Sequence, residues 1–208
     1  MNILIADDHA VVREGLKQII SQIDEIASIT EAENGTHVID LALKNNYNLL
    51  LLDISMPGKS GFEILSYLKQ IKPDLPILII SVHPENQYAK RVLKAGASGY
   101  ISKFASPEEL KHAILTSIKG GKYISNELAQ ELAMGLIKNR SDNPAEILSN
   151  REFEVMRLIA CGKTVSEIAD EICLSIKTIS TYRSRILTKM KFKNNAEITK
   201  YCILNSLV

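Results

Sequence analysis

The stretch Asn48-Leu49-Leu50-Leu51-Leu52-Asp53 is a short apolar run that ends on a carboxylate, and the turn residues Met56-Pro57-Gly58 follow it closely. An apolar run of this length, without alternation, is typical of a strand covered on both faces, as the strands of a parallel sheet are. We therefore predict a buried strand whose carboxyl end carries Asp53. In open parallel α/β sheets, ligands bind at that end of the strands.

Two other apolar runs end on charged residues in the same way. Asn2–Ala6 is followed by Asp7 and Asp8, and Gly99–Ser102 is followed by Lys103. At one edge of a sheet the acids would repel one another unless a cation lay among them. The constellation therefore predicts a hard metal ion, an anion that bridges to it, and a lysine that holds the anion.

Strands and amphipathic helical stretches alternate through the first 120 residues. Five such repeats predict an α/β fold, a doubly wound parallel sheet with helices on both faces and the flavodoxin-like strand order 2-1-3-4-5. That order would place Ser81 beside the three aspartates. The expected strands are Asn2–Ala6, Ile26–Ala32, Asn48–Leu52, Ile77–Val82 and Gly99–Ser102. The expected helices lie near Val11–Ser21, Thr36–Lys44, Gly61–Ile71, Asn86–Ala95 and Pro107–Lys119.

The 208-residue chain is 46% hydrophobic and 24% charged, an ordinary composition for a soluble globular protein. Asp7 and Asp8 stand where a signal peptide would need an unbroken apolar core, and no apolar run is long enough to cross a bilayer. We expect a cytoplasmic protein with no membrane partner. Cys161, Cys173 and Cys202 lack metal-ligand spacing, so we expect small core residues.

Charge is distributed unevenly along the chain. Residues 1–145 carry 15 basic against 17 acidic side chains, a net charge of −2, whereas residues 146–208 carry 10 against 7, a net charge of +3. From Ser175 onward seven basic residues face a single acid, Glu197. This asymmetry favours an anionic polymer as the partner of the C-terminal segment, although a solvated basic helix face would look the same.

The pattern changes after residue 120. A short helix is expected over Asn126–Lys138, and the polar, breaker-rich stretch Asn139–Pro144 is typical of a linker. Beyond it only helical patterns occur. We therefore divide the chain into a domain over 1–120, a linker with a short helix over 121–145, and an all-α domain over 146–208.

The C-terminal domain carries clear helix-start signals. Ser149 and Glu152 form a capping box, a second helix is expected over Val165–Ile172, and Ser175 caps a long helix over Ile176–Met190. The spacing of the apolar residues predicts a buried face made of Ile176, Ile179, Ile186, Leu187 and Met190. The opposite face carries the short polar and basic residues Lys177, Ser180, Thr181, Ser184 and Arg185, which suit a DNA major groove.

The N-terminal domain resembles the receiver domain of two-component response regulators. The resemblance rests on Asp7-Asp8, Asp53 with Met56-Pro57-Gly58, Ser81, Tyr100 and Lys103. It implies that Asp53 is the phospho-acceptor and that Mg²⁺ is the cofactor. By the same resemblance the metal is held by Asp8, Asp53 and the backbone carbonyl of Ser55, with Asp7 acting through water.

The resemblance also implies a switch next to the acceptor. Lys103 and Ser81 would hold phosphoryl oxygens, and Tyr100 would swing inward when Ser81 turns toward the phosphoryl group. Threonine is more usual at the position of Ser81, so the switching equilibrium is expected to differ. His83 lies where water would approach the acyl phosphate; it either tunes the lifetime of that group or is simply an exposed histidine.

Residues 148–208 resemble the LuxR-type helix-turn-helix of the NarL/FixJ subfamily, through Leu148–Val155, Ala160–Ala169 and Leu174–Tyr182. In such a domain Ile176–Met190 is the recognition helix. The implied DNA contacts are Lys177, Ser180, Thr181, Arg183, Ser184 and Arg185. The last helix, Ala196–Leu204, would pair two copies through Ile198, Tyr201 and Cys202.

These patterns together predict a response regulator. A sensor histidine kinase would phosphorylate Asp53, and the protein would then bind promoter DNA as a dimer and regulate transcription. Its only catalysis would be its own aspartyl phosphorylation and dephosphorylation. A phosphatase of the haloacid dehalogenase type is disfavoured, because that class needs a D-x-D pair and this chain has Ser55 and His9 at the second positions. A constitutive DNA-binding protein with an unphosphorylated receiver remains the alternative.

Overall fold

The protein is described here from a computed structural model that covers residues 1–137, 147–205 and 207–208. The chain divides into two compact units, Met1–Ala133 and Met134–Val208, and each is treated by itself. The predicted linker stretch Asn139–Pro144 lies outside the described residues. Within the described part of the chain, no helix is long and apolar enough to cross a bilayer.

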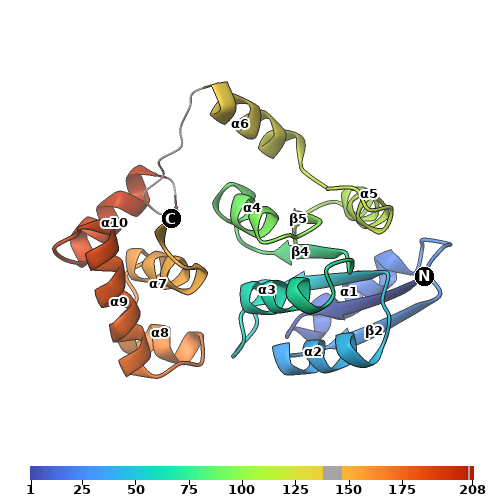
Figure 1. Ribbon diagram of the computed structural model, residues 1–208, viewed down its shortest axis with the longest axis horizontal. Helices are drawn as coiled ribbons and strands as arrows, with labels where there is room; N and C mark the ends of the chain where they lie inside the picture. The colour runs from blue at the N-terminus through green and yellow to red at the C-terminus, as the bar shows by residue number, and fades with distance from the viewer. Residues whose placement is uncertain (138–146, 206) are drawn as a thin grey trace. The chain divides into compact units, whose positions relative to one another are not determined.

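The first unit is built on a parallel sheet with the order β2-β1-β3-β4-β5, which confirms the predicted flavodoxin-like arrangement. Figure 1 shows the strands side by side with their helices around them. The strands are β1 (Asn2–Ala6), β2 (Ser28–Ala32), β3 (Leu49–Asp53), β4 (Ile77–Ser81) and β5 (Gly99–Ser102). All residues of β3 and β4 are buried, as the unbroken apolar runs predicted.

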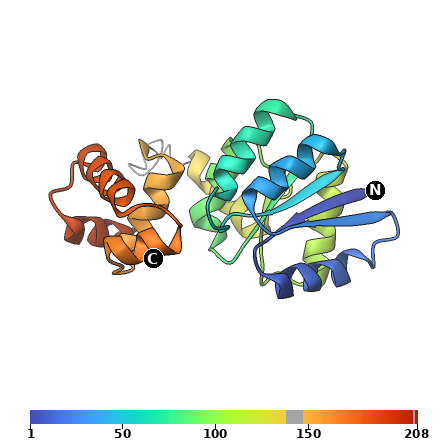
Figure 2. The ribbon, with the colours of Figure 1, turned by 90° about the horizontal axis from the view of Figure 1, so that it is seen from below.

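Helices cover both faces of this sheet (Figure 2). One face packs on α1 (Ala10–Ile20) and α5 (Pro107–Ile118), and the alternate strand residues Ile3, Leu49 and Leu78 lie in that core. The other face is covered by α2 (Gly35–Lys44), α3 (Gly61–Ile71) and α4 (Glu85–Lys94). Because the side chains of a strand alternate between faces, four consecutive leucines fill both cores at once.

The helix starts are fixed by their own side chains. Ser60 and Ser106 form capping boxes with Glu63 and Glu109 at the beginnings of α3 and α5. Each box satisfies two backbone N–H groups that the first turn would otherwise leave without a partner. Gly61, the first residue of α3, donates its N–H to the carbonyl of Ile54 at 3.1 Å. The start of α3 is therefore held against the carboxyl end of β3, where Asp53 lies.

The chain after α5 remains attached to the first unit. Tyr123 is buried, its N–H donates to the Ser98 carbonyl at 2.8 Å, and it forms a parallel bridge with Gly99. Ser125 donates its hydroxyl to Glu85 Oε2 at 2.6 Å, just before α6 (Asn126–Ile137). The compact unit thus extends to Ala133, so the first part of the predicted 121–145 linker belongs to it.

The second unit is all-α in its described part. Its helices are α7 (Asn150–Ala160), α8 (Val165–Glu171), α9 (Ile176–Met190) and α10 (Asn195–Leu204). Capping boxes begin α7 and α8, and Ser175 caps α9 by accepting the N–H of Thr178. The turn between α8 and α9 contains Cys173 at a φ of 52°, a left-handed conformation that makes the connection tight.

Three core predictions for this unit are wrong. Ile176 was expected on the buried face of α9, but it is 56% exposed because it stands in the first turn, where the helix has only begun to pack. Cys161 and Cys173 are exposed, since each lies at a helix end, and only Cys202 is buried. Ile179, Ile186 and Met190 are buried as predicted, whereas Leu187, expected on the same face, is only half-buried.

Gly61 provides a test of the contact between α3 and β3. A Cβ at Gly61 would lie 2.5 Å from the Asp53 carbonyl oxygen and 2.6 Å from Ile54 Cα, both backbone atoms that cannot move aside cheaply. Gly61→Ala should therefore lower the free energy of unfolding by about 1–3 kcal/mol in urea titrations. Gly15→Ala, in the exposed face of α1 with open space around it, should raise it by up to about 1 kcal/mol. Equal effects of the two changes would contradict this contact.

Candidate functional site

The sheet brings three predicted site residues from separate strands into direct contact. Lys103 Nζ lies 2.6 Å from Asp7 Oδ2 and 2.7 Å from Asp53 Oδ2. The Lys103 N–H also donates to the Ser81 carbonyl at 2.8 Å, which continues the β4–β5 ladder past the strand ends. The register of the parallel strands, rather than any local motif, therefore aligns the two carboxylates with the ammonium.

This cluster is buried and its charges are coupled. Asp7 is fully buried and Asp53 is 1% exposed. Burial raises the pKa of Asp53, against the opposing effect of the Lys103 ammonium. Burial lowers the pKa of Lys103, but the Asp53 and Asp7 carboxylates outweigh this and hold it above its usual range. Lys103 is thus a fixed positive charge beside a carboxylate that is poorly solvated.

Asp7, Asp8 and His9 offer ligand atoms that all lie within 4.8 Å of one another. Asp7 Oδ2 and Asp8 Oδ1 are buried, and no described group donates a well-aligned hydrogen bond to them, although Lys103 and the His9 ring approach them closely. Buried carboxylate oxygens in this condition fit a hard cation such as Mg²⁺. Asp53 lies outside this group and reaches Asp7 through Lys103.

Sequence reasoning missed His9. Its Nδ1 lies 2.8 Å from Asp8 Oδ1 and its N–H donates to Asp7 Oδ1 at 2.9 Å. The only available signal was its position directly after the paired acids. Because 67% of the His9 side chain is exposed, it can move away from the carboxylates without disturbing the core.

Ser55 and His83 close the other side of the site. The Ser55 N–H donates to Asp53 Oδ1 at 3.0 Å, which fixes the Asp53 carboxylate against the start of the β3–α3 loop. Ser55 Oγ lies 2.9 Å from His83 Nε2, and the His83 N–H donates to Ser81 Oγ at 3.1 Å. His83 is half-buried, so the alternative of a merely exposed histidine is wrong.

Tyr100, the residue expected to swing inward, is buried within the first unit in this structure. It is 1% exposed and donates its hydroxyl to the His83 carbonyl at 2.7 Å. Burial raises the pKa of Tyr100 well above its usual range, so the hydroxyl stays protonated and can donate. The His83 ring stacks on Tyr88 with ring centroids 4.9 Å apart. The β3–α3 loop, the β4–α4 turn and α4 are therefore in contact through His83.

The arrangement of these groups is suited to binding a phosphoryl group. A buried carboxylate, an adjacent fixed ammonium, a hydroxyl at the end of β4 and a hard-cation site can together neutralise and orient a multiply charged phosphoryl group.

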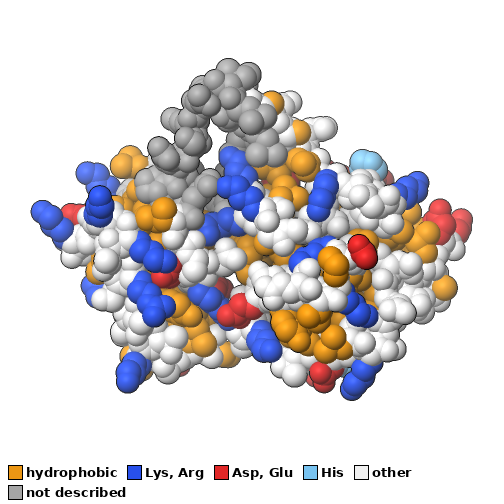
Figure 3. All heavy atoms as spheres, viewed as in Figure 1, with side chains coloured by type: hydrophobic (Ala, Val, Ile, Leu, Met, Phe, Trp, Pro, Cys, Tyr) orange, Lys and Arg blue, Asp and Glu red, His pale blue; other side chains and the backbone are white. Residues whose placement is uncertain are grey.

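The recognition residues predicted for α9 lie in two exposed rows at four-residue spacing. Ser180 and Ser184 form one row, and the other contains Lys177, Thr181 and Arg185. Thr181 donates its hydroxyl to the Lys177 carbonyl at 2.9 Å, as helical threonines often do. Figure 3 shows lysine and arginine side chains spread over the helices of the second unit.

Arg183 does not belong to these rows. It is half-buried, and its Nε donates to Asn195 Oδ1 at 2.7 Å at the start of α10. Its spacing from Ile179 places it toward the buried side of α9. The prediction that Arg183 contacts DNA is therefore not supported by its position, because its guanidinium joins α9 to α10.

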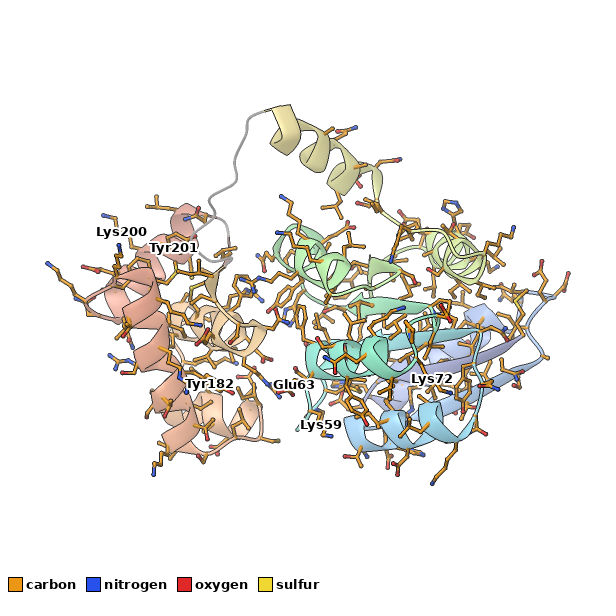
Figure 4. The ribbon with its side chains drawn as sticks, in the orientation of Figure 1. Lys59, Glu63, Lys72, Tyr182, Lys200 and Tyr201 are labelled. Atoms are coloured by element: carbon orange, nitrogen blue, oxygen red, sulfur yellow. The ribbon has the colours of Figure 1, made fainter. Side chains whose placement is uncertain are left out.

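The prediction that Ile198, Tyr201 and Cys202 of α10 pair two copies also disagrees with the structure. Ile198 and Cys202 are fully buried within the unit, so they cannot meet a second copy. Tyr201 is half-buried and its ring contacts Phe192 with centroids 5.6 Å apart. Figure 4 shows Lys200 and Tyr201 on neighbouring faces of α10. The exposed side of the helix is a shallow apolar groove lined by Ala196, Thr199, Lys200, Ile203 and Leu204.

A buried cluster of carboxylates and a lysine at the carboxyl edge of a doubly wound sheet, followed by a helix-turn-helix unit, is the arrangement of a two-domain DNA-binding regulator as a class. Residues 3–115 match the family described as response regulator receiver domain, and residues 146–202 match bacterial regulatory proteins of the luxR family. The chain belongs to the response regulator family, with a receiver domain and a LuxR-type DNA-binding domain.

Similar proteins match this chain over all or nearly all of its length. The response regulator UvrY of Escherichia coli K12 is 35% identical over all of this chain and 95% of its own. RcsB from Salmonella enterica serovar Typhimurium, solved bound to promoter rprA with the phosphomimetic beryllofluoride, is 29% identical with a TM-score of 0.67, covering 97% of both chains. A structure of two RcsB dimers bound to two parallel DNAs is 30% identical with a TM-score of 0.61, covering 100% of this chain and 99% of that one.

The burial of Asp53 leads to a prediction about stability. The folded state keeps a proton on Asp53 to higher pH than the unfolded state does, so ionisation of Asp53 opposes folding as pH rises through and above the ordinary carboxyl range. Asp53→Asn should therefore be more stable than the wild type at pH 7, and this advantage should shrink toward pH 4. Urea unfolding at several pH values measures it. An advantage that is the same at every pH would contradict the raised pKa.

Proposed function

We propose that this protein is a cytoplasmic transcription regulator whose Asp53 accepts a phosphoryl group from a sensor histidine kinase. The single observation that supports this best is the contact of Lys103 with both Asp7 and Asp53 in a buried cluster at the carboxyl ends of the strands. A structural ion pair would need one carboxylate. A second buried carboxylate is costly unless the site is built to receive a cation and an anion together.

The proposed reaction is a transfer between a phosphohistidine, or a small acyl phosphate, and Asp53. An oxygen of the Asp53 carboxylate forms the new P–O bond while the bond to the donor's leaving atom breaks and that atom takes the electron pair. Lys103 Nζ offsets charge on a phosphoryl oxygen, and the Ser81 hydroxyl donates to another. Asp8, Asp53 and the Ser55 carbonyl would hold Mg²⁺ directly and Asp7 would act through a water, and the bound ion would neutralise phosphoryl charge. In hydrolysis, attack of water on phosphorus would break the bond to the Asp53 oxygen, release inorganic phosphate and return Asp53 to its carboxylate.

The surface around the acceptor supports docking of a protein donor. Val11 is 85% exposed on α1, three residues after Asp8, and Phe104 is 82% exposed directly after Lys103. These are the two most exposed of the large apolar residues in the described chain. Exposed apolar residues beside a reactive group are typical of an interaction surface, and the kinase is the partner that must reach Asp53.

Pairing of two copies on DNA is supported by the groove on α10. Ile203 and Leu204 are 60% and 73% exposed, and together with Ala196 they give the helix an apolar outer side. The similar protein RcsB has been solved as two dimers bound to two parallel DNAs. We propose that phosphorylation promotes a dimer of this protein and that the dimer binds promoter DNA with α9 in the major groove.

The acceptor assignment is tested by intact-mass spectrometry after incubation with acetyl phosphate and magnesium. The wild type should gain one phosphoryl mass and Asp53→Ala should gain none. Asp8→Ala should label more slowly at a given magnesium concentration, because one ligand is lost. Asp74→Ala, which removes an exposed acid of the same unit, should label like the wild type. Undiminished labelling of Asp53→Ala would show that the acceptor is another residue.

The DNA assignment is tested by gel shifts at several salt concentrations. Lys177→Ala and Arg185→Ala should each weaken binding to all sequences and reduce the salt slope by about one unit, because each removes a phosphate contact. Arg183→Ala should leave the slope closer to the wild type, since its guanidinium is bound to Asn195.

Changes at Ser180, Thr181 or Ser184 should instead alter sequence preference, by about 1–3 kcal/mol for each lost base contact. If the three changes at basic residues and the three at hydroxyl residues all weakened binding to specific and random DNA equally, α9 would not be the recognition helix.

A further inference from the structure

Ile176 is a large apolar residue of α9 whose side chain lies exposed to solvent. It is 56% exposed, while Ile179, one turn further, is fully buried. The start of the helix is held by other groups, because Ser175 Oγ accepts the Thr178 N–H at 3.0 Å and lies 2.7 Å from Thr178 Oγ1. The side chain of Ile176 is therefore not what fixes the beginning of α9.

The position of Ile176 relates it to the predicted base contacts. Four-residue spacing places Ile176, Ser180 and Ser184 in one row along the helix, and all three are exposed. The neighbouring row begins one residue later, at Lys177. Ile176 thus completes the row of short side chains at the helix N-terminus, which is the end of a recognition helix that contacts base edges.

The largest apolar group that a base pair presents in the major groove is the C5-methyl of thymine, which makes it the best partner for an aliphatic side chain. The edges of guanine, cytosine and adenine present hydrogen-bonding groups, whereas thymine adds its C5-methyl group. We propose that Ile176 is a specificity-determining residue that packs on the C5-methyl of a thymine in each half-site. This inference rests on the proposed binding of α9 to DNA, and it adds an apolar reader to a surface otherwise made of hydroxyl and basic groups.

The experiment begins with a duplex selected by the wild-type protein, in the presence of beryllofluoride, from a randomised DNA pool. Each thymine of that duplex is then replaced singly by deoxyuridine, which removes only the methyl group. Affinities are measured for the wild type, Ile176→Ala and Ile176→Val. Ile147→Ala serves as the matched control, because Ile147 is 55% exposed but lies outside α9.

At one thymine in each half-site, deoxyuridine should weaken wild-type binding about fourfold, the value expected for one buried methyl-sized group. Ile176→Ala should bind the unmodified duplex more weakly by at least that factor and lose nothing further on deoxyuridine substitution, so the two changes are not additive. Ile176→Val should keep most of the sensitivity, and Ile147→Ala all of it.

Two results would overturn the inference while leaving the proposed function intact. One is a wild-type protein that binds its selected duplex but shows the same deoxyuridine profile as Ile176→Ala. The other is an Ile176→Ala protein that weakens on random and selected DNA equally, which would assign the residue to non-specific contacts. If the wild type selects no sequence at all, the proposed DNA-binding function fails together with the inference.

Discussion

One ammonium shared by two buried carboxylates is the interaction on which the rest of the first unit depends. Lys103 approaches Asp7 and Asp53 to within 2.7 Å, and both acids are almost completely buried. Such a cluster is stable only if its members are held in register, because a misplaced buried charge is costly. The parallel sheet provides that register, with the acids at the ends of β1 and β3 and the lysine directly after β5. The local excess of negative charge also makes the site receptive to a cation.

Continuous contacts lead from this cluster to the segment that leaves the receiver. Ser81 Oγ accepts the His83 N–H, Tyr100 donates to the His83 carbonyl, and the His83 ring stacks on Tyr88 of α4. At the start of the same helix Glu85 accepts the hydroxyl of Ser125, which precedes α6. A rearrangement at Ser81 would therefore reach a turn that is bonded to the start of that segment. This contiguity gives a physical route for coupling, since both ends share the β4–α4 turn.

The fold and the centre of the site could be predicted from the sequence because their signals are strong and local. Apolar runs ending in Asp7, Asp53 and Lys103 specify buried parallel strands, and sheet topology then brings those ends together. Features that depend on contacts between helices, such as the burial of a single side chain, could not be predicted from the sequence pattern. The periodicity of α9 could not show that Ile176 precedes the packed turns, nor that Arg183 meets Asn195. The burial of Ile198 and Cys202 depends on α7 and the rest of the helical unit, which periodicity on α10 alone does not reveal.

The central claim is that occupation of the Asp53 site controls DNA binding, and operator titration with and without beryllofluoride tests it most directly. A duplex selected from a random pool by the full-length protein serves as the probe. Beryllofluoride with magnesium should tighten wild-type binding by about 5- to 150-fold, the usual range of coupling between two sites, and should leave Asp53→Ala unchanged. Wild-type affinity that is equally tight without beryllofluoride would contradict the account and favour a constitutive DNA-binding protein.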